Sequence, residues 1–100
     1  MFTQNLLPVH PGEVLLEKFL EPLEMSQDRV AKELNVPPRQ IHAIVRGERS
    51  INADMAHRLA HYFGMSERYW LELQARYDLG VEEQTIHRRM NRAVELERSA

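Results

Sequence analysis

The sequence of 100 residues has no cysteine, only four glycines and no long hydrophobic run. Without cysteine, disulfide scaffolds, cysteine-based zinc fingers, iron–sulfur clusters and thiol nucleophiles are all excluded. The longest apolar runs are short, as in Ala43-Ile44-Val45, whereas about 18 apolar residues are needed to span a bilayer. The first residues also lack the basic and apolar segments of a signal peptide. We therefore expect a cytoplasmic protein with no membrane partner.

Signals for β-strands are missing as well, because no apolar–polar alternation persists and no Asn-Gly or Asp-Gly hairpin turn occurs. Short helical segments with recognisable ends are present instead, and a length of 100 residues suits one domain. The sequence therefore predicts an all-α fold. The first expected helix has Pro11 in its first turn and continues through 13–20. The others cover 27–34, a segment from 38 to Gly47, one from Asn52 to Gly64, one from Ser66 that Gly80 interrupts, and a last one from about 82.

The formal net charge of -2 at first argues against nucleic-acid binding, but the charge is unevenly distributed. Segments 1–25 and 59–87 each carry -3, whereas segments 26–58 and 88–100 each carry +2. Contact with phosphate needs a local basic patch rather than a basic average. The charge pattern therefore allows DNA binding through residues 26–58.

Residues 26–47 read as a helix, a three-residue turn and a second helix. Ser26 suits the N-cap of the first helix, and Asn35 suits a left-handed stop at its end. The small Ala31 lies where two helices must approach closely, within a compact apolar set: Leu34, Val36, Ile41 and Ile44. This pattern is typical of a helix-turn-helix, in which a small core holds the second helix out toward a major groove.

The exposed side of that second helix offers groove-reading side chains. Arg39 matches the two acceptors of guanine, Gln40 matches adenine, and the small Ala43 allows close approach to a base or a thymine methyl group. His42 flanks this face and would make DNA affinity depend on pH if it lies near phosphate; an ordinary surface histidine is the alternative. Phosphate contacts are expected from Gln27, Arg46, Arg49 and Ser50.

Four segments carry a resemblance to a known family: HPGEVL at 10–15, VRGERSI at 45–51, ADMAHRLAHYFG at 53–64 and SERYWLELQARYDL at 66–79. In this order they resemble the HigA antitoxins, which belong to the XRE-type class of phage-repressor-like helix-turn-helix proteins. The resemblance implies a five-helix repressor-like domain that forms a homodimer, binds double-stranded operator DNA and represses its own operon. It also implies a partner toxin, a HigB protein similar to the RelE-type mRNA interferases.

By residue, the resemblance implies base reading by Pro38, Arg39, Gln40 and Ala43, and phosphate contact by Gln27, Arg46 and Arg49. One departure is Pro37-Pro38, where the family usually has Ser or Thr as a helix cap and phosphate ligand; proline supplies neither that cap nor an N–H. The end of the domain resembles the family's dimerisation region, so the expected interface contains Tyr69, Trp70, Leu73 and Tyr77. Burial of these aromatic side chains in the core is the alternative.

We expect three parts of the chain: an N-terminal extension over 1–9, the helix-turn-helix domain over 10–79 with its motif at 26–47, and a C-terminal helical tail over 80–100. The tail has a weak apolar stripe, Ile86, Met90 and Val94, which suits contact with a partner or a fraying end. Its arginines also allow contact with DNA, although Glu95 and Glu97 dilute the basic charge.

No catalytic constellation occurs, so we expect neither an enzyme nor a cofactor. His57 and His61 lie four residues apart on one helix face, but no third ligand stands at a diagnostic spacing. Solvated histidines are therefore favoured over a metal site.

Two alternatives to an autorepressing antitoxin stay open. One is a stand-alone XRE-type transcriptional regulator, whose DNA chemistry would be identical. The other is a helical protein-binding module without DNA affinity, an interpretation for which Pro37-Pro38 and the net charge of -2 argue.

Overall fold

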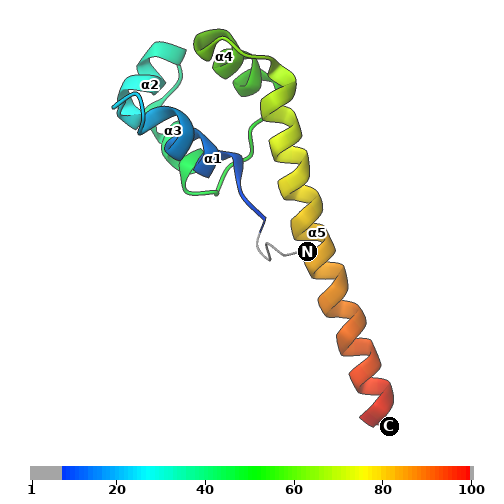
Figure 1. Cartoon of the computed structure of the whole chain (residues 1–100). Coiled ribbons are helices and arrows are strands. Elements are labelled where there is room, and N and C mark those ends of the chain that lie inside the picture. The colour runs from blue at the N-terminus through cyan, green and yellow to red at the C-terminus, as the bar shows by residue number, and fades with distance from the viewer. Residues whose placement is uncertain (1–7, 100) are drawn as a thin grey trace.

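A computed structural model describes the backbone of residues 8–99 and the side chains of residues 8–96. All regular structure in the described chain is helical (Figure 1), which confirms the predicted fold class. The elements are α1 (Pro11–Val14), the π-helix η1 (Leu15–Leu20), α2 (Gln27–Leu34), α3 (Pro38–Val45), α4 (Ala53–Phe63) and α5 (Glu67–Ser99). None of the described helices is long and apolar enough to cross a membrane.

The ends of α2 and α4 follow the local chemistry expected from the sequence. Ser26 Oγ accepts a hydrogen bond from the Arg29 N–H at 3.0 Å, and Asn52 Oδ1 accepts one from the Met55 N–H at 2.9 Å. Each bond satisfies a backbone donor that the first helical turn leaves without a partner. Asn35 and Gly64, at φ 60° and 75°, end the two helices in the left-handed conformation.

The first helical segment begins as predicted, with Pro11 in its first turn, but differs in form. After Val14 it widens into a π-helix. The wider turn persists to its end, where the Glu21 N–H donates to the Leu16 carbonyl at 2.9 Å. The following Pro22 has no N–H to extend the ladder.

One apolar core lies where α1, η1, α2, α3, α4 and the first part of α5 meet. Its largest fully buried members are Trp70, Leu15, Leu20, Ile41, Ile44, Met55 and Leu59. Trp70 packs against Phe19, with ring centroids 5.2 Å apart, so α5 is anchored to the π-helix. The core thus joins the chain's N-terminal segment to its last helix.

The last helix is continuous, which corrects the prediction of an interruption at Gly80 followed by a new helix from about residue 82. α5 runs unbroken for 33 residues, or about 50 Å at 1.5 Å per residue. A Cβ atom on Gly80 would lie 3.0 Å from Cγ of Pro8. Gly80 therefore marks a close crossing of two segments rather than a helix end.

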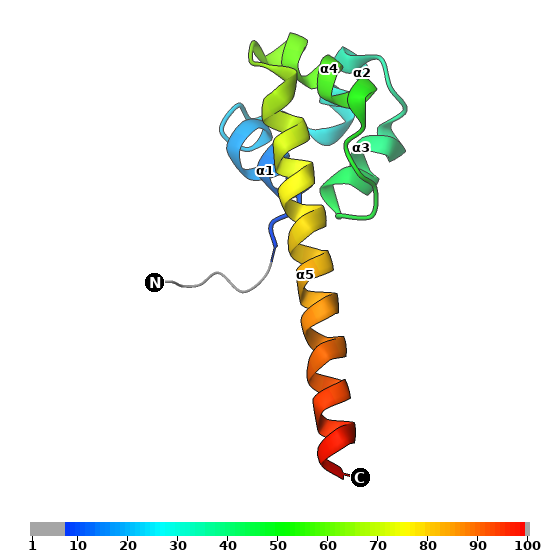
Figure 2. The ribbon, with the colours of Figure 1, turned by 90° about the vertical axis from the view of Figure 1, so that its right-hand side faces the viewer.

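Because α5 outruns the body, the molecule measures 59 × 29 × 22 Å. Figure 2 shows the far part of α5 projecting as a rod from the packed helices. We call residues 79–96 of this rod the distal α5. The predicted boundary between the domain and its tail, at residue 80, falls inside this helix, and residues 1–7 of the predicted extension lie outside the described residues.

Candidate nucleic-acid interface

Helix α3 has one face that is buried in the core and one face that is exposed to solvent. Ile41 and Ile44 have no exposed surface, whereas Pro38 and Arg39 are exposed, and Gln40 and Ala43 are half-buried. An amphipathic helix buries its apolar stripe and leaves the opposite side to solvent. The four residues predicted to read bases therefore lie together on or beside the solvent side of one rigid helix.

The buried face of α3 is held in place by α1, which packs against it at very short distance. A Cβ atom on Gly12 would lie 1.8 Å from the Ile44 carbonyl oxygen, so only glycine fits there. His10 prepares this contact, because its Nδ1 accepts a hydrogen bond from the Gly12 N–H at 2.9 Å and caps α1. Pro11 occupies the first turn, where its missing N–H is not needed. The motif His10-Pro11-Gly12 thus positions α3, a role that sequence reasoning did not identify.

His10 is buried between Gly47, in the loop after α3, and Tyr77 of α5. Its ring meets that of Tyr77 edge to face with centroids 4.7 Å apart, and a Cβ on Gly47 would come within 3.7 Å of it. Burial lowers the pKa of His10 from 6.5, and the nearby Asp78 carboxylate partly opposes this shift. The neutral ring is also the form that accepts the capping hydrogen bond.

Arg58 of α4 holds the turn between α2 and α3 by a hydrogen bond to the end of α2. Its guanidinium donates one hydrogen bond to the carbonyl of Leu34 at 2.7 Å and another to Oδ2 of Asp54 at 2.9 Å. Carbonyls at a helix C-terminus lack helical partners, and a cation is favoured beside them. Arg58 therefore ties the helix-turn-helix to the body. A basic residue six positions after the Asn52 cap gives no local sequence signal for this long-range role.

The loop that follows α3 is tied to α5 by a buried glutamine. Gln74 Oε1 accepts a hydrogen bond from the Ile51 N–H at 2.8 Å, while its Nε2 donates to Asp78 at 2.9 Å. Gln74 is only 7% exposed, and buried polar groups need such partners. Gln74 therefore fixes the loop between α3 and α4 to α5.

The N-terminus of α3 confirms the departure noted in the sequence. Pro37 occupies the N-cap and makes no side-chain hydrogen bond, while Pro38 takes the first helical position. The fixed φ of proline suits that position. The helix thus begins without a capping hydroxyl, and Arg39 is its first long polar side chain.

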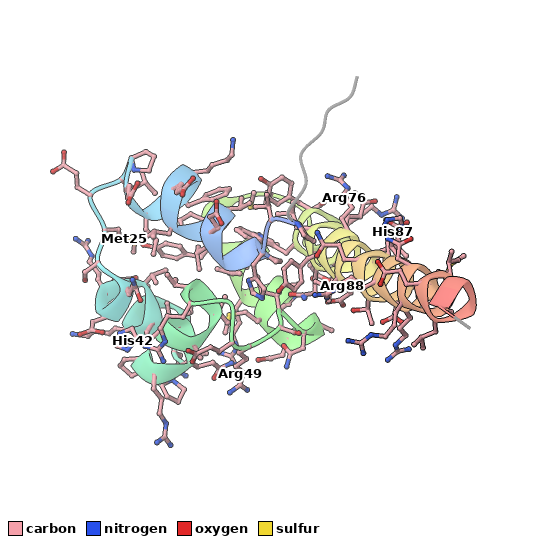
Figure 3. The ribbon with its side chains drawn as sticks, turned by 90° about the horizontal axis from the view of Figure 1, so that it is seen from below. Met25, His42, Arg49, Arg76, His87 and Arg88 are labelled. Carbon is pink, nitrogen blue, oxygen red and sulfur yellow. The ribbon has the colours of Figure 1, made fainter. Side chains whose placement is uncertain are left out.

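The residues predicted to contact phosphate surround α3. Gln27 opens α2 and is half-buried, while Arg46, Arg49 and Ser50 are exposed beyond the end of α3. Arg46 also forms an ion pair with Glu48 at 3.2 Å, which offsets part of its charge. In Figure 3, Arg49 and His42 lie on the α3 side of the body, away from α1.

His42 links the two helices of the motif. Its Nε2 lies 2.8 Å from Oδ1 of Asp28 in the first turn of α2. This contact joins the flank of the reading helix to the end of α2 that carries Gln27. The sequence placed His42 on the flank of the reading face but did not foresee the carboxylate beside it.

The predicted dimer-interface residues have different positions. Trp70 has no exposed surface in the single chain and donates from Nε1 to Sδ of Met65 at 3.2 Å, so its side chain has no surface to offer a second subunit. Tyr69, Leu73 and Tyr77 are half-buried, with Tyr77 covered on one side by His10. The alternative of core burial therefore holds for Trp70.

His57 and His61 stand near one carboxylate that sequence spacing did not reveal. His57 Nδ1 contacts Glu67 at the start of α5, and all three side chains line one shallow pocket. Within the described residues, no three side chains of the metal-binding types are arranged to hold an ion.

Comparison with known proteins agrees with this architecture. The helix-turn-helix family matches residues 16–70, which include the whole of α2, α3 and α4. The chain belongs to the helix-turn-helix family. Virulence-associated protein I of Dichelobacter nodosus is 46% identical to this helix-turn-helix protein over 82 residues. The match covers 81% of this chain and 76% of that relative.

Solved structures place this helix-turn-helix protein beside antitoxins. The antitoxin HigA of Pseudomonas aeruginosa with the higBA promoter has 37% identity and a TM-score of 0.79, over 83% of this chain and 90% of that one. PA4674 of the same organism, in complex with 18-bp operator DNA, has 38% identity and a TM-score of 0.78, over 81% and 87%. These findings confirm the resemblance to HigA antitoxins.

Proposed function

We propose that this protein is a sequence-specific DNA-binding antitoxin that represses its own operon as a homodimer and neutralises a HigB-like mRNA interferase. The observation that carries the proposal is the free face of α3, held rigidly by Gly12 and Arg58 while Arg39 remains exposed. The similar structures of HigA with the higBA promoter and of PA4674 in complex with operator DNA support it.

The proposed base contacts come from Pro38, Arg39, Gln40 and Ala43. Arg39 would donate two hydrogen bonds to guanine, and Gln40 would pair in a similar way with adenine. Pro38 and Ala43 are small and apolar, so they permit close approach and contact with a thymine methyl group. In this arrangement α3 enters the major groove with its N-terminal residues foremost.

The proposed phosphate contacts come from Gln27, Arg46, Arg49 and Ser50. They carry no sequence information but set the register of α3 in the groove. With a net charge of -2, the protein has little long-range attraction to phosphate. Recognition therefore depends on this local patch and on a second subunit on the next turn of the groove.

Neutralisation of a toxin is the second part of the proposal. Segment 59–87 carries -3, which is an acidic surface of the kind that a basic RNA-cleaving toxin would meet. Co-expression with the protein of the adjacent reading frame tests this part: a stable complex that suppresses toxicity supports it. An adjacent frame without a toxin would instead identify a stand-alone regulator.

Binding of the full chain to labelled DNA from its own promoter tests the DNA part. Replacing Arg39 by alanine should weaken operator binding by about 1 to 3 kcal/mol and relax the preference at one base pair. Arg88→Ala on the distal α5 is the matched control and should retain the wild-type base preference. If wild-type protein does not shift any promoter fragment while a toxin complex still forms, the chain is a protein-binding module.

A further inference from the structure

A carboxylate lies among the residues that we propose to contact phosphate. Asp28 stands in the first turn of α2, next to Gln27, and its side chain is 73% exposed. The helix dipole favours a carboxylate at this end of α2, but a negative charge repels the phosphates that Gln27 would contact. Within the described residues, the ion-pair partner of Asp28 is His42 of α3, whose Nε2 lies 2.8 Å from Oδ1. The net charge at this point of the surface therefore depends on His42.

His42 lies on the same side of α3 as the arginines of that helix and its end. It follows Arg39 by three residues and precedes Arg46 by four, which places all three within about 60° of one another around the helix axis. The His42 side chain is 37% exposed, so a ligand can reach it. Figure 3 shows His42 and Arg49 on the α3 side of the body. The imidazole thus flanks the face that would enter the groove.

We infer that His42 is a further DNA-contacting residue, which binds a backbone phosphate as the imidazolium, and that Asp28 is the positioning residue that holds its ring; this inference rests on the proposed operator binding. With a neutral histidine the pair is negatively charged, and with an imidazolium it is neutral overall. Only the protonated pair removes the repulsion between Asp28 and the DNA. Binding of the operator is therefore coupled to the uptake of a proton by His42.

The carboxylate determines where that proton enters. An ionised carboxylate only accepts hydrogen bonds, so the neutral ring of His42 carries its proton on Nε2 and donates it to Asp28. The proton gained from solvent on DNA binding therefore enters at Nδ1. In the imidazolium both nitrogens are donors, which allows Nε2 to keep its contact with Asp28 while Nδ1 donates to a phosphate oxygen.

The charges around His42 favour this protonation only when DNA is present. Asp28 favours the imidazolium, whereas cations of both motif helices oppose it. These cations are Lys32, one turn after Asp28 on α2, and Arg39 and Arg46. DNA phosphates offset the cations and add negative charge of their own. The balance therefore moves toward the imidazolium in the complex.

The other segments packed against α3 leave this balance unchanged. Glu48, in the loop that follows α3, pairs with Arg46 at 3.2 Å, and this pair contributes little net charge. Helix α1 meets α3 at Ile44, on the buried side, so Glu13 of α1 lies away from His42. Asp28 is thus the carboxylate that decides the charge of the pair.

Operator affinity as a function of pH tests the inference. Binding of the full chain to labelled promoter DNA, at constant ionic strength, should weaken by about 10-fold between pH 6 and 8, the effect of a one-unit shift in one titration. His42→Gln keeps a donor for Asp28 but gains no proton, so its affinity should stay near the wild-type value at pH 8 throughout. A wild-type pH profile in His42→Gln would overturn the inference.

His57→Gln is the matched control. His57 also contacts a carboxylate of a neighbouring helix, Glu67, but it lies on α4 and is exposed. This variant should keep the wild-type profile, and equal flattening by both substitutions would contradict the role of His42. Protonation of His10 would act in the opposite direction, because it removes the acceptor that caps α1 and would weaken binding at low pH.

Asp28→Asn tests the carboxylate separately. Asparagine keeps an oxygen that accepts from Nε2 of His42 but carries no charge. At pH 8 this variant should bind the operator several-fold more tightly than the wild type, and its pH profile should be shallower, because the carboxylate no longer stabilises the imidazolium. Unchanged affinity at pH 8 would remove Asp28 from this role. Circular dichroism of each variant verifies that the helices remain folded.

Calorimetry measures the proton itself. Titration of operator DNA into the protein at pH 7, in two buffers with different ionisation enthalpies, should show proton uptake by the wild type and by His57→Gln but much less by His42→Gln. A chain that binds no promoter fragment at either pH removes the operator-binding proposal and this inference with it. A chain that binds its operator with equal proton uptake in His42→Gln removes the inference alone.

Discussion

The packed body and the distal α5 are both helical, yet they use apolar residues in opposite ways. In the body, Leu59 and Trp70 have no exposed surface, whereas Ile86 and Met90 of the distal α5 are 44% and 62% exposed. Helical spacing of apolar residues identifies a face that needs covering, but it does not say which surface covers it. In the body the covering surface belongs to the same chain, whereas nothing within the described residues covers Ile86 and Met90.

Replacing a glycine by alanine should give the largest difference in stability between the two regions. Gly12→Ala should destabilise the fold by more than about 4 kcal/mol, because its Cβ would lie 1.8 Å from a backbone oxygen of Ile44. Gly80→Ala should instead change the free energy of unfolding by less than about 1 kcal/mol: alanine favours the helix, which offsets the small shift that its Cβ, 3.0 Å from Cγ of Pro8, requires of that side chain. Urea unfolding of both variants measures the difference. Equal destabilisation would mean that the crossing at Gly80 is as rigid as the core.

Removing large apolar side chains should give the next largest contrast. Trp70→Ala should reduce the free energy of unfolding by about 3 to 5 kcal/mol, because it empties the centre of the core. Leu96→Ala, at a site that is 66% exposed, should change it by less than about 0.5 kcal/mol. Thermal and urea unfolding measure both. A small effect at Trp70 would show that α5 is not anchored through this side chain.

The two regions should also differ in how much a single arginine contributes to stability. Arg58→Ala should cost about 1 to 2 kcal/mol, because it removes a charged donor from the carbonyl of Leu34 in a partly buried place. Arg92→Ala on the exposed distal α5 should cost less than about 0.5 kcal/mol. Hydrogen exchange at the turn between α2 and α3 should accelerate only in Arg58→Ala. Equal exchange rates would remove Arg58 from its role as a clamp.

The smallest expected effect is a pH dependence at the junction between the body and α5. Burial lowers the pKa of His10 below 6.5 in the folded protein, so the unfolded chain binds its proton more readily. The contribution of His10 to stability is therefore complete above about pH 6.5 and declines as the pH falls toward the lowered folded pKa. Thermal unfolding between pH 7.5 and 5 measures this decline.

Two histidine variants separate this junction from the rest of the chain. His10→Asn should flatten the decline, because asparagine caps a helix without titrating in this range. His87→Asn, on the exposed distal α5, should retain it. A decline that persists unchanged in His10→Asn would assign the pH dependence to another group.

Much of the fold could be predicted because its signals are local. The caps at Ser26 and Asn52 and the left-handed stops at Asn35 and Gly64 lie within a few residues of the helices that they end. Gly80 carried the same local signal and was misread, because its reason is Pro8, which lies far away in the sequence. The sequence placed Pro11 in the first turn of α1 but did not identify His10 as its cap, since a histidine cap is uncommon.

The candidate site shows the same division. The periodicity of α3 was sufficient to place Arg39 and Gln40 on the side away from Ile41 and Ile44. Their proposed contacts with bases stay predictions. The sequence could not show that Trp70 lies inside the single chain, because an aromatic residue at helical spacing suits a core and an interface equally.

By itself the sequence determined the helical class, most helix ends, the helix-turn-helix and the face of α3 that is exposed. These features depend on backbone caps and helical periodicity, which act over one or two turns. Only the tertiary structure decided that Gly12 must be glycine, that Arg58 holds the turn before α3 and Gln74 the loop after it, and that α5 continues past Gly80. Each of these depends on contacts between residues far apart in the chain, and no local pattern encodes such contacts.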